Sequence, residues 1–287
     1  MTKELIVEKV KISSPEKTVY SKAGITKKDI ALYYQKISKR MLPHIKNRII
    51  SSVRCPDGTG SNCFYKKHLE KNSRGLKKII IPKKNNTKND YYYITNISGI
   101  ISEVQMNTIE FHIWGSKILD INKPDIMIFD LDPDESLNLE DVREGVKDLK
   151  SILDKLGIVS FLKTSGGKGY HIVIPFKPAT SWAKFRAFAK NIAQLMETNW
   201  PDKYTSNMRK SLRKNKIYID WVRNNKSQTS VAPYSLRARD YPAVSMPIKW
   251  SELEKIAPNE IDIKKAVLRL KRKDPWEHFF DINQELK

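Results

Sequence analysis

The middle of the chain alternates between short apolar runs and longer amphipathic segments. Apolar runs of strand length predict buried strands, and apolar residues spaced three or four apart predict helices. The pattern predicts strands at 125–131, 158–163, 170–175 and 216–222, and helices at 137–156 and 180–200. The order strand, helix, strand, strand, helix, strand is that of a split β-α-β unit of the ferredoxin-like or RRM-like kind.

The first part of the chain carries a separate helical pattern. From Thr26 to Leu42, a capping threonine, an acidic first turn and apolar residues at helical spacing predict a helix that Pro43 ends. The predicted class is therefore α+β (mixed α/β). We expect an N-terminal α/β lobe at 1–110, an RRM-like module at 111–250 and a helical C-terminal extension at 251–287.

The charge balance indicates a class of partner. Lys and Arg total 53 against 32 Asp and Glu, which gives a net charge of +21 and a pI near 9.7. This excess favours a polyanion such as nucleic acid, because binding neutralises phosphates and releases counterions. The alternative is a lysine-rich composition that only keeps the chain soluble, and frequent Asn and Ile residues are compatible with it. Residues Lys77–Asp90 predict a strand that ends in an exposed basic loop.

Two further features bear on the compartment. No stretch of about 18 apolar residues occurs, and the N-terminus carries no signal-peptide or transit-peptide pattern, so we expect a cytoplasmic protein without a membrane partner. Cys55 and Cys63 are too few for a zinc site, which needs about four ligands. A reducing cytosol disfavours a disulfide, so we expect two ordinary thiols.

Three aspartates occupy strand positions that suit a metal site. Asp130 and Asp132 come at the end of the strand predicted at 125–131, and residues two apart on a strand point to one face. Neighbouring carboxylates repel each other unless a cation lies between them, and oxygen ligands suit Mg²⁺ or Mn²⁺. Asp220, near the end of a later strand, completes the ligand supply of two-metal phosphoryl transfer. The alternatives are an acidic turn and a salt-bridged strand residue.

A glycine-rich loop joins two of the predicted strands. It reads Thr-Ser-Gly-Gly-Lys-Gly-Tyr-His over residues 164–171. Glycines allow the backbone to approach a ligand closely, successive amides can form an anion-binding nest, and Ser165, Lys168 and His171 add donors. The loop is not a Walker loop, which opens a helix. A simple hairpin turn is the alternative, and the number of donors favours triphosphate binding.

Taken in order, these three motifs resemble those of the archaeo-eukaryotic primase superfamily. The chain is more closely similar to the polymerase domain of bacterial ATP-dependent DNA ligase D, an end-joining enzyme that works with Ku. The likeness runs nearly end to end, and it implies a primase-polymerase fold. The further segments that carry it are Pro15–Tyr20, Thr26–Lys27, Arg54–Gly58, Phe64–His68, Glu110–Gly115, Asp130–Pro133 and Gln228–Arg239. Each motif alone has low specificity, whereas the set is specific.

The resemblance implies a role for each matching residue. It implies that two divalent cations, with Mn²⁺ favoured over Mg²⁺, bind to Asp130, Asp132 and Asp220, and that His112 lies beside the catalytic centre. It implies that the triphosphate of an incoming NTP or dNTP binds to Ser165, Lys168, His171 and Arg237. It implies that DNA binds to Lys17, Lys27, Arg54 and Phe64, with the two lysines on the 5′-phosphate of a recessed or gapped end and Phe64 stacked on a template base. Considered without the resemblance, Phe64 and His112 also fit core positions, and Lys17 and Lys27 also fit solvated lysines.

The implied activity is metal-dependent nucleotidyl transfer. The enzyme would add ribo- or deoxynucleotides to primer 3′ ends, for gap filling and end processing in double-strand break repair by non-homologous end joining. The sequence holds no ligase Lys-x-Asp-Gly motif, so we expect a polymerase that works with Ku and a separate ATP-dependent DNA ligase. Two alternatives stay open: a replicative or plasmid primase, and a non-catalytic module that binds DNA ends.

Overall fold

The chain forms two compact units that are interleaved along the sequence. The computed structural model describes residues 5–69, 73–82 and 88–286. The first unit comprises Met1–Trp114, Val231–Ser245 and Asp262–Arg272, and the second comprises Gly115–Ser230, Met246–Ile261 and Lys273–Lys287. The sequence predicted three consecutive segments instead, because local patterns do not show into which unit a late segment packs.

The first unit combines helices with several small sheets. Its helices are α1 (Lys27–Ile45), α2 (Ile97–Gln105) and α5 (Ile263–Arg269), with a 3-10 turn at Ser21–Ala23. Its strands are β1 (Leu5–Val7), β2 (Val10–Ile12), β3 (Thr18–Tyr20), β4 (Ile25–Thr26), β5 (Ile50–Arg54), β6 (Phe64–Lys66), β7 (Leu76–Pro82), β8 (Lys88–Ile94) and β9 (Thr108–Trp114). Strand β5 pairs antiparallel with both β6 and β9. The chain re-enters this unit through β15 (Thr229–Val231).

Helix α1 begins where the sequence predicts and ends later. The Thr26 hydroxyl accepts a hydrogen bond from the Asp29 amide (3.2 Å), and the Asp29 carboxylate accepts one from the Thr26 amide (2.8 Å), which makes a capping box. The prediction that Pro43 ends the helix is wrong, because the helix continues to Ile45. Pro43 removes one backbone donor only within the last turn, and burial of His44 and Ile45 favours that turn.

Buried tyrosines attach the segment Val231–Ser245 to the rest of the first unit. The Tyr20 hydroxyl donates to the carbonyl of Arg237 (2.7 Å), and the Tyr34 hydroxyl accepts a hydrogen bond from the amide of Leu236 (3.0 Å). Both tyrosine side chains are fully buried. Buried hydroxyls need such partners, so these two contacts fix the backbone on which Arg237 stands.

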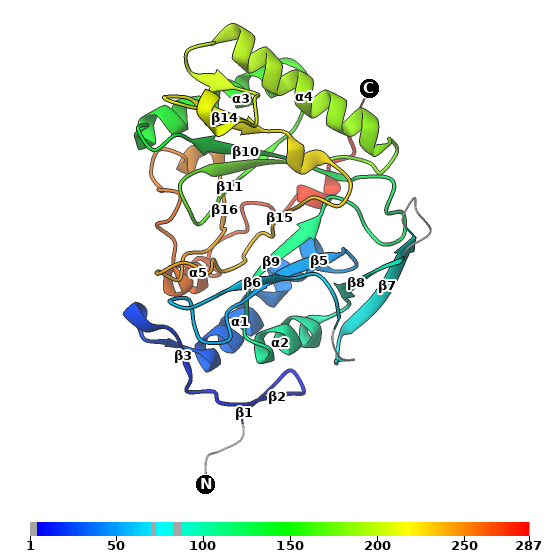
Figure 1. Cartoon of the computed structure of the whole chain (residues 1–287), viewed down its shortest axis with the longest axis vertical. Coiled ribbons are helices and arrows are strands. Elements are labelled where there is room, and N and C mark those ends of the chain that lie inside the picture. The colour runs from blue at the N-terminus through cyan, green and yellow to red at the C-terminus, as the bar shows by residue number, and fades with distance from the viewer. Residues whose placement is uncertain (1–4, 70–72, 83–87, 287) are drawn as a thin grey trace. The chain divides into compact units, whose positions relative to one another are not determined.

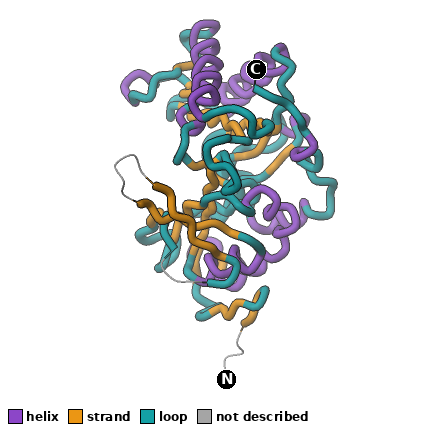
Figure 2. The backbone as a smooth tube through the Cα atoms, turned by 90° about the vertical axis from the view of Figure 1, so that its right-hand side faces the viewer, coloured by secondary structure: helices purple, strands orange, loops and turns teal. Residues whose placement is uncertain are grey.

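Strands β7 and β8 form an extended two-stranded ribbon (Figure 2). Their antiparallel register pairs Leu76 with Ile94 and Pro82 with Lys88. The strand predicted at the start of Lys77–Asp90 is therefore present. Most of the predicted basic loop, residues 83–87, lies outside the described residues. None of the helices in the described part combines the length and the apolar composition that a membrane span needs.

The second unit contains the predicted split β-α-β order. Its helices are α3 (Leu139–Lys155) and α4 (Trp182–Asn199). Its strands are β10 (Ile126–Pro133), β11 (Phe161–Thr164), β12 (Tyr170–Pro175), β13 (Tyr204–Thr205), β14 (Ile217–Asp220) and β16 (Pro247–Ile248), with 3-10 turns at Lys210–Leu212, Val222–Asn224, Trp250–Glu252 and Phe279–Asp281. The six strands form one sheet in the order β13-β14-β10-β12-β11-β16, against which α3 and α4 pack (Figure 1). The order β14-β10-β12-β11, with every neighbour antiparallel, confirms the ferredoxin-like prediction.

Helix α3 approaches the sheet closely at Gly145. A Cβ atom there would lie 2.9 Å from Ile217 Cδ1 and 3.3 Å from Leu131 Cδ2. Leu131 and Ile217 therefore face α3. Since side chains alternate along a strand, the residues next to them on β10 and β14 point to the opposite face of the sheet.

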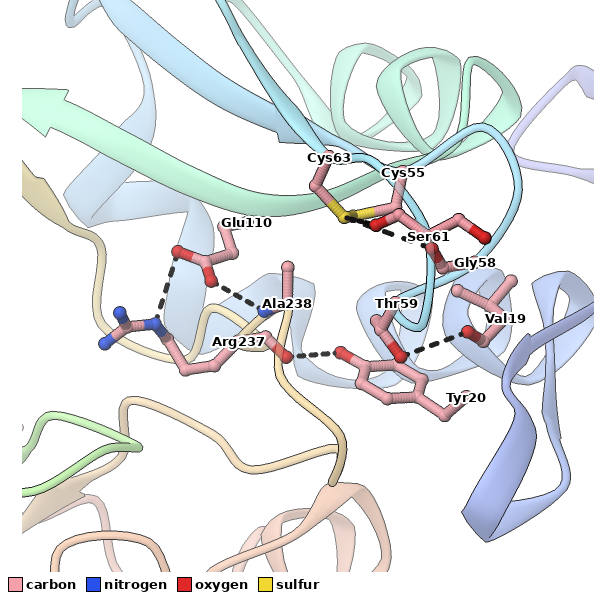
Figure 3. Close-up of a disulfide and its surroundings, with 10 residues drawn as sticks. All are labelled: Val19, Tyr20, Cys55, Gly58, Thr59, Ser61, Cys63, Glu110, Arg237 and Ala238. Atoms are coloured by element: carbon pink, nitrogen blue, oxygen red, sulfur yellow. Dashed lines mark hydrogen bonds and ion pairs between the residues drawn. A yellow bond between two sulfur atoms is a disulfide. The ribbon is translucent and has the colours of Figure 1, made fainter.

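A disulfide closes the loop between β5 and β6 (Figure 3). It joins Cys55 and Cys63, so the expectation of two free thiols is wrong. The antiparallel register places Arg54 opposite Phe64, and the adjoining cysteines thereby lie with their Cα atoms 4.3 Å apart. The sequence argument weighed only the redox compartment and could not see that the hairpin brings the two thiols together.

Removal of this disulfide should destabilise the protein. The two cysteines are eight positions apart, and the loop-closure entropy of so short a loop predicts that Cys55→Ser/Cys63→Ser lowers the free energy of unfolding by about 2–3 kcal/mol. Urea unfolding without reductant measures the difference. Reductant should lower the stability of the wild type and leave the variant unchanged. Equal stability of the oxidised wild type and the variant would contradict the prediction.

Candidate active site

A row of polar side chains crosses the sheet of the second unit. The register pairs Asp220 of β14 with Asp130 of β10, Asp130 with His171 of β12, and His171 with Lys163 of β11. Directly paired residues of antiparallel strands point to the same face, which here is the face opposite α3. His171 Nε2 lies 3.3 Å from Asp130 Oδ1, and Lys163 Nζ lies 3.0 Å from His171 Nδ1. The row thus joins two acids, an imidazole and the buried amine of Lys163. Of these groups, only Lys163 was not assigned by the sequence analysis.

Asp132 lies two residues after Asp130 and shares its face of β10. Its Oδ2 atom is 3.2 Å from Arg213 Nη1, and Asp220 Oδ2 is 2.9 Å from Arg223 Nε. Arg213 and Arg223, which flank Asp220 in sequence, therefore offset part of the negative charge of the aspartates. They were not predicted as site residues, although the basic run around Asp220 was an available signal.

The three carboxyl groups differ in pKa. Burial raises the pKa of Asp130, but the charge and hydrogen bond of His171, together with the charge of Arg223, outweigh burial and hold it well below the usual range. Burial raises the pKa of Asp132, and the negative charge of Asp130 raises it further. Burial also raises the pKa of Asp220, an effect that Arg223 partly offsets. A cation bound among these acids would stabilise the ionised form of all three.

The oxygen donors fit a hard divalent cation, although arginines now pair with two of them. Within residues 5–69, 73–82 and 88–286, no three His, Cys, Asp or Glu side chains already lie close enough together to hold one ion. The carboxylates of Asp132 and Asp220 each pair with a guanidinium group instead.

The glycine-rich loop joins β11 to β12 and is held by its own serine. Ser165 Oγ accepts hydrogen bonds from the amides of Gly167 (3.0 Å) and Gly169 (3.2 Å). Gly166 has a φ of +66°, a region that favours glycine. A Cβ atom at Gly169 would lie 2.3 Å from the carbonyl oxygen of Leu131. The loop therefore approaches β10 next to the first two aspartates, and only glycine allows it.

Lys168 projects from this loop into solvent. Its Nζ atom lies 2.9 Å from Glu135 Oε1, and both side chains are exposed. A cavity of about 320 Å³ lies beside the pair, lined by the loop at Gly167, by the start of α3 and by Pro258. Of the residues predicted to bind a triphosphate in this unit, His171 is buried in the row, whereas Lys168 is able to reorient toward a ligand.

In the first unit, the two lysines predicted to bind a 5′-phosphate adjoin each other. The Lys27 amide donates to the Lys17 carbonyl (2.9 Å), and Lys27 is only 3% exposed. Burial, and then the positive charge of Lys17, lower the pKa of Lys27 from 10.5 to about 8. Lys17 Nζ donates to the carbonyl of Pro56 and lies 3.6 Å from Asp57. An anion bound here would relieve the repulsion between the two ammonium groups.

Arg54 and Phe64 form a pair across β5 and β6. The guanidinium carbon lies 5.4 Å from the ring centroid, and Arg54 Nε donates to the Met106 carbonyl (2.8 Å). Phe64 is 46% exposed and so does not occupy the core. An exposed ring backed by a cation suits stacking on a nucleobase.

His112 and Arg237 meet at a carboxylate that the sequence analysis did not assign. Glu110 lies two residues before His112 on β9, and its Oε2 atom is 2.7 Å from His112 Nε2 and 3.2 Å from Arg237 Nε. Figure 3 shows the Arg237 side chain reaching Glu110. The signal was present, because residues two apart on a strand share a face. His112 is buried, as expected if it occupied a core position, and its ring also contacts Tyr65.

Comparison with known proteins decides the family. Residues 26–276 match the family described as "LigD, primase-polymerase domain". The chain belongs to this family. It is 30% identical over 281 residues to the "Multifunctional non-homologous end joining protein LigD" of Pseudomonas aeruginosa, a match that covers 96% of this chain and 34% of that protein. It is 32% identical over 274 residues to the "Multifunctional non-homologous end joining DNA repair protein LigD" of Mycobacterium tuberculosis, covering 92% and 36%.

A solved LigD structure has the same fold. It is the "Polymerase Domain from Mycobacterium tuberculosis Ligase D in complex with DNA", which matches with a TM-score of 0.87 and 31% identity over 95% of this chain and 98% of that one. The resemblance found in the sequence motifs is thereby confirmed. The chain spans about a third of the length of the curated LigD proteins just described.

The buried lysine gives a prediction about stability and pH. Because folding lowers the pKa of Lys27 from 10.5 to about 8, the unfolded chain binds more protons between these values. The contribution of Lys27 to the free energy of unfolding therefore rises with pH across this window. Lys27→Met should remove that rise, so its free energy of unfolding relative to that of the wild type should fall between about pH 8 and about pH 10.5 in urea unfolding. Lys22→Met, at an exposed position, is the control. A pH dependence of Lys27→Met identical to that of the wild type would contradict the assignment.

Proposed function

We propose that this chain is a metal-dependent nucleotidyl transferase that extends primer 3′ ends on broken or gapped DNA. The observation that carries the proposal is the register that sets Asp220 opposite Asp130, with Asp132 on the same face, in a chain of the LigD primase-polymerase domain family. Two divalent cations, Mn²⁺ or Mg²⁺, when bound to these carboxylates, would neutralise phosphate charge and lower the pKa of the attacking hydroxyl.

The proposed reaction is in-line attack of the primer 3′-OH on the α-phosphate of an NTP or dNTP, with release of pyrophosphate. Positioning and electrostatic stabilisation do most of the work in such transfers. His171, held between Asp130 and Lys163, offers a fixed imidazole to the triphosphate. Lys168 would exchange its exposed partner Glu135 for phosphate oxygens. Arg237 would add a bidentate guanidinium contact.

We also propose that the first unit reads the DNA end. Lys17 and Lys27 would bind the 5′-phosphate at the far side of a gap, and the exposed ring of Phe64, backed by Arg54, would stack on a template base. The names of the relatives place those proteins in non-homologous end joining. We extend this role to the present chain, with Ku and an ATP-dependent DNA ligase as its partners.

The metal assignment predicts a loss of activity without a loss of DNA binding. Asp130→Ala should lower single-nucleotide extension of a labelled primer with Mn²⁺ by at least about 100-fold, because the acid shared by the row and the metal site is gone. Asp202→Ala is the matched control, since Asp202 is exposed and lies outside the row. Gel-shift affinity for the gapped duplex should persist in both variants. Full activity of Asp130→Ala would exclude the site.

The lysine pair predicts dependence on a 5′-phosphate. With two gapped duplexes that differ only in this phosphate, the wild type should extend the phosphorylated one faster, and Lys17→Met or Lys27→Met should bring the rate ratio toward one. Lys22→Met, whose side chain pairs with Asp240 on the surface, should behave as the wild type. Extension indifferent to the phosphate would favour a replicative or plasmid primase. No extension with either metal would favour a non-catalytic module that binds DNA ends.

A further inference from the structure

Glu110 is a buried carboxylate to which the proposed function gives no part. It lies on β9 with 5% of its surface exposed. Its Oε1 atom accepts a hydrogen bond from the Ala238 amide (2.6 Å), and its Oε2 atom lies 3.2 Å from Arg237 Nε (Figure 3). The same Oε2 atom lies 2.7 Å from His112 Nε2. One carboxylate therefore joins the two residues of the first unit that were predicted to act at the catalytic centre.

The charge state of Glu110 supports a permanent ionic contact. Burial raises the pKa of this carboxyl, but the hydrogen bond from His112, the charge of Arg237 and the amide of Ala238 together lower it to about 2. The group is thus ionised at neutral pH. A charged acceptor makes shorter and stronger hydrogen bonds than a neutral one, so the carboxylate holds the imidazole and the Ala238 amide firmly, and its charge pairs with the guanidinium.

The three partners of the Glu110 carboxylate come from two distant parts of the chain. His112 stands on the same strand as Glu110, whereas Ala238 is 128 positions away in sequence. Tyr20 fixes the carbonyl of Arg237 independently. The carboxylate therefore sets the distance and the relative orientation of an imidazole on a rigid strand and a guanidinium on a loop. Side chains that act on a substrate need such supporting contacts, because small displacements cost activity.

We propose that Glu110 is a positioning residue for nucleotidyl transfer, which holds His112 and Arg237, two residues of its own unit, in one fixed arrangement. This inference rests on the proposed function. Because the same carboxylate holds both residues, its loss would weaken nucleotide binding through Arg237 and slow the chemical step through His112.

The first unit supplies a matched comparison. Glu103 is another fully buried carboxylate, and it receives hydrogen bonds from the hydroxyls of Ser52, Tyr92 and Thr108 and an ion pair from Lys66 (2.6 Å). None of these partners was predicted to touch nucleotide or DNA. If buried carboxylates of this unit serve only to stabilise it, Glu103 and Glu110 should behave alike when they are changed.

The test compares Glu110→Gln with Glu103→Gln in single-nucleotide extension. A glutamine at 110 keeps the shape and one acceptor oxygen, but it cannot accept from both Ala238 and His112, and it has no charge to pair with Arg237. We expect kcat/KM for the nucleotide to fall by about 10–100-fold, with KM raised and kcat lowered, while circular dichroism and affinity for gapped DNA stay those of the wild type. Glu103→Gln should lower the midpoint of urea unfolding and leave kcat and KM of the folded protein unchanged.

The possible outcomes distinguish a failure of the positioning role from a failure of the proposed function. Wild-type kinetics in Glu110→Gln, or equal kinetic losses in both variants, would overturn the positioning role and leave the proposed function standing. An inactive wild type would overturn the proposed function, and the inference would fall with it. A selective kinetic loss in folded Glu110→Gln supports both.

Discussion

The pairing register of β14, β10, β12 and β11 is the constraint on which the second unit depends. Side chains alternate with a period of two, so a slip of one residue in any strand would move its polar residue to the face that α3 covers. Burial of Leu131 and Ile219 on that face opposes such a slip. The close approaches at Gly145 and Gly169 depend on the same register, because Leu131 of β10 lies against both glycines. Its side chain would crowd a Cβ at Gly145, and its carbonyl oxygen would clash with a Cβ at Gly169.

Much of the second unit could be predicted from the sequence because its signals are local. Hydrophobic periodicity located β10, β12, α3 and α4, and two-residue spacing put Asp130 and Asp132 on one face. Which strands are neighbours is not a local property. The sequence joined Asp220 to Asp130 and Asp132 only as ligands of one metal site, and the register adds that Asp220 lies directly opposite Asp130.

The features that sequence reasoning missed depend on contacts between distant residues or on geometry within a turn. Glu110 meets Arg237 only after the chain has returned to the first unit, and Cys55 meets Cys63 only when the hairpin closes. Arg213 and Arg223 could not be identified as partners of the aspartates, because many basic residues surround Asp220 in sequence. Periodicity also could not show that a proline would be tolerated in the last turn of α1, since that depends on what the turn buries.

Interleaving has a consequence for synthesis on the ribosome. The Arg40 guanidinium of α1 donates to the carbonyl of Leu270, 230 positions later in the chain. At about 5–20 residues per second, translation of that interval takes on the order of 10–50 s. During this time α1 has emerged without its partners from Val231–Ser245 and Asp262–Arg272. Synthesis of the first unit therefore starts before that of the second, yet the first unit is complete only at Arg272, when all of the second unit except Lys273–Lys287 has been made. The apolar surfaces of α1 that the late segments cover stay uncovered until then.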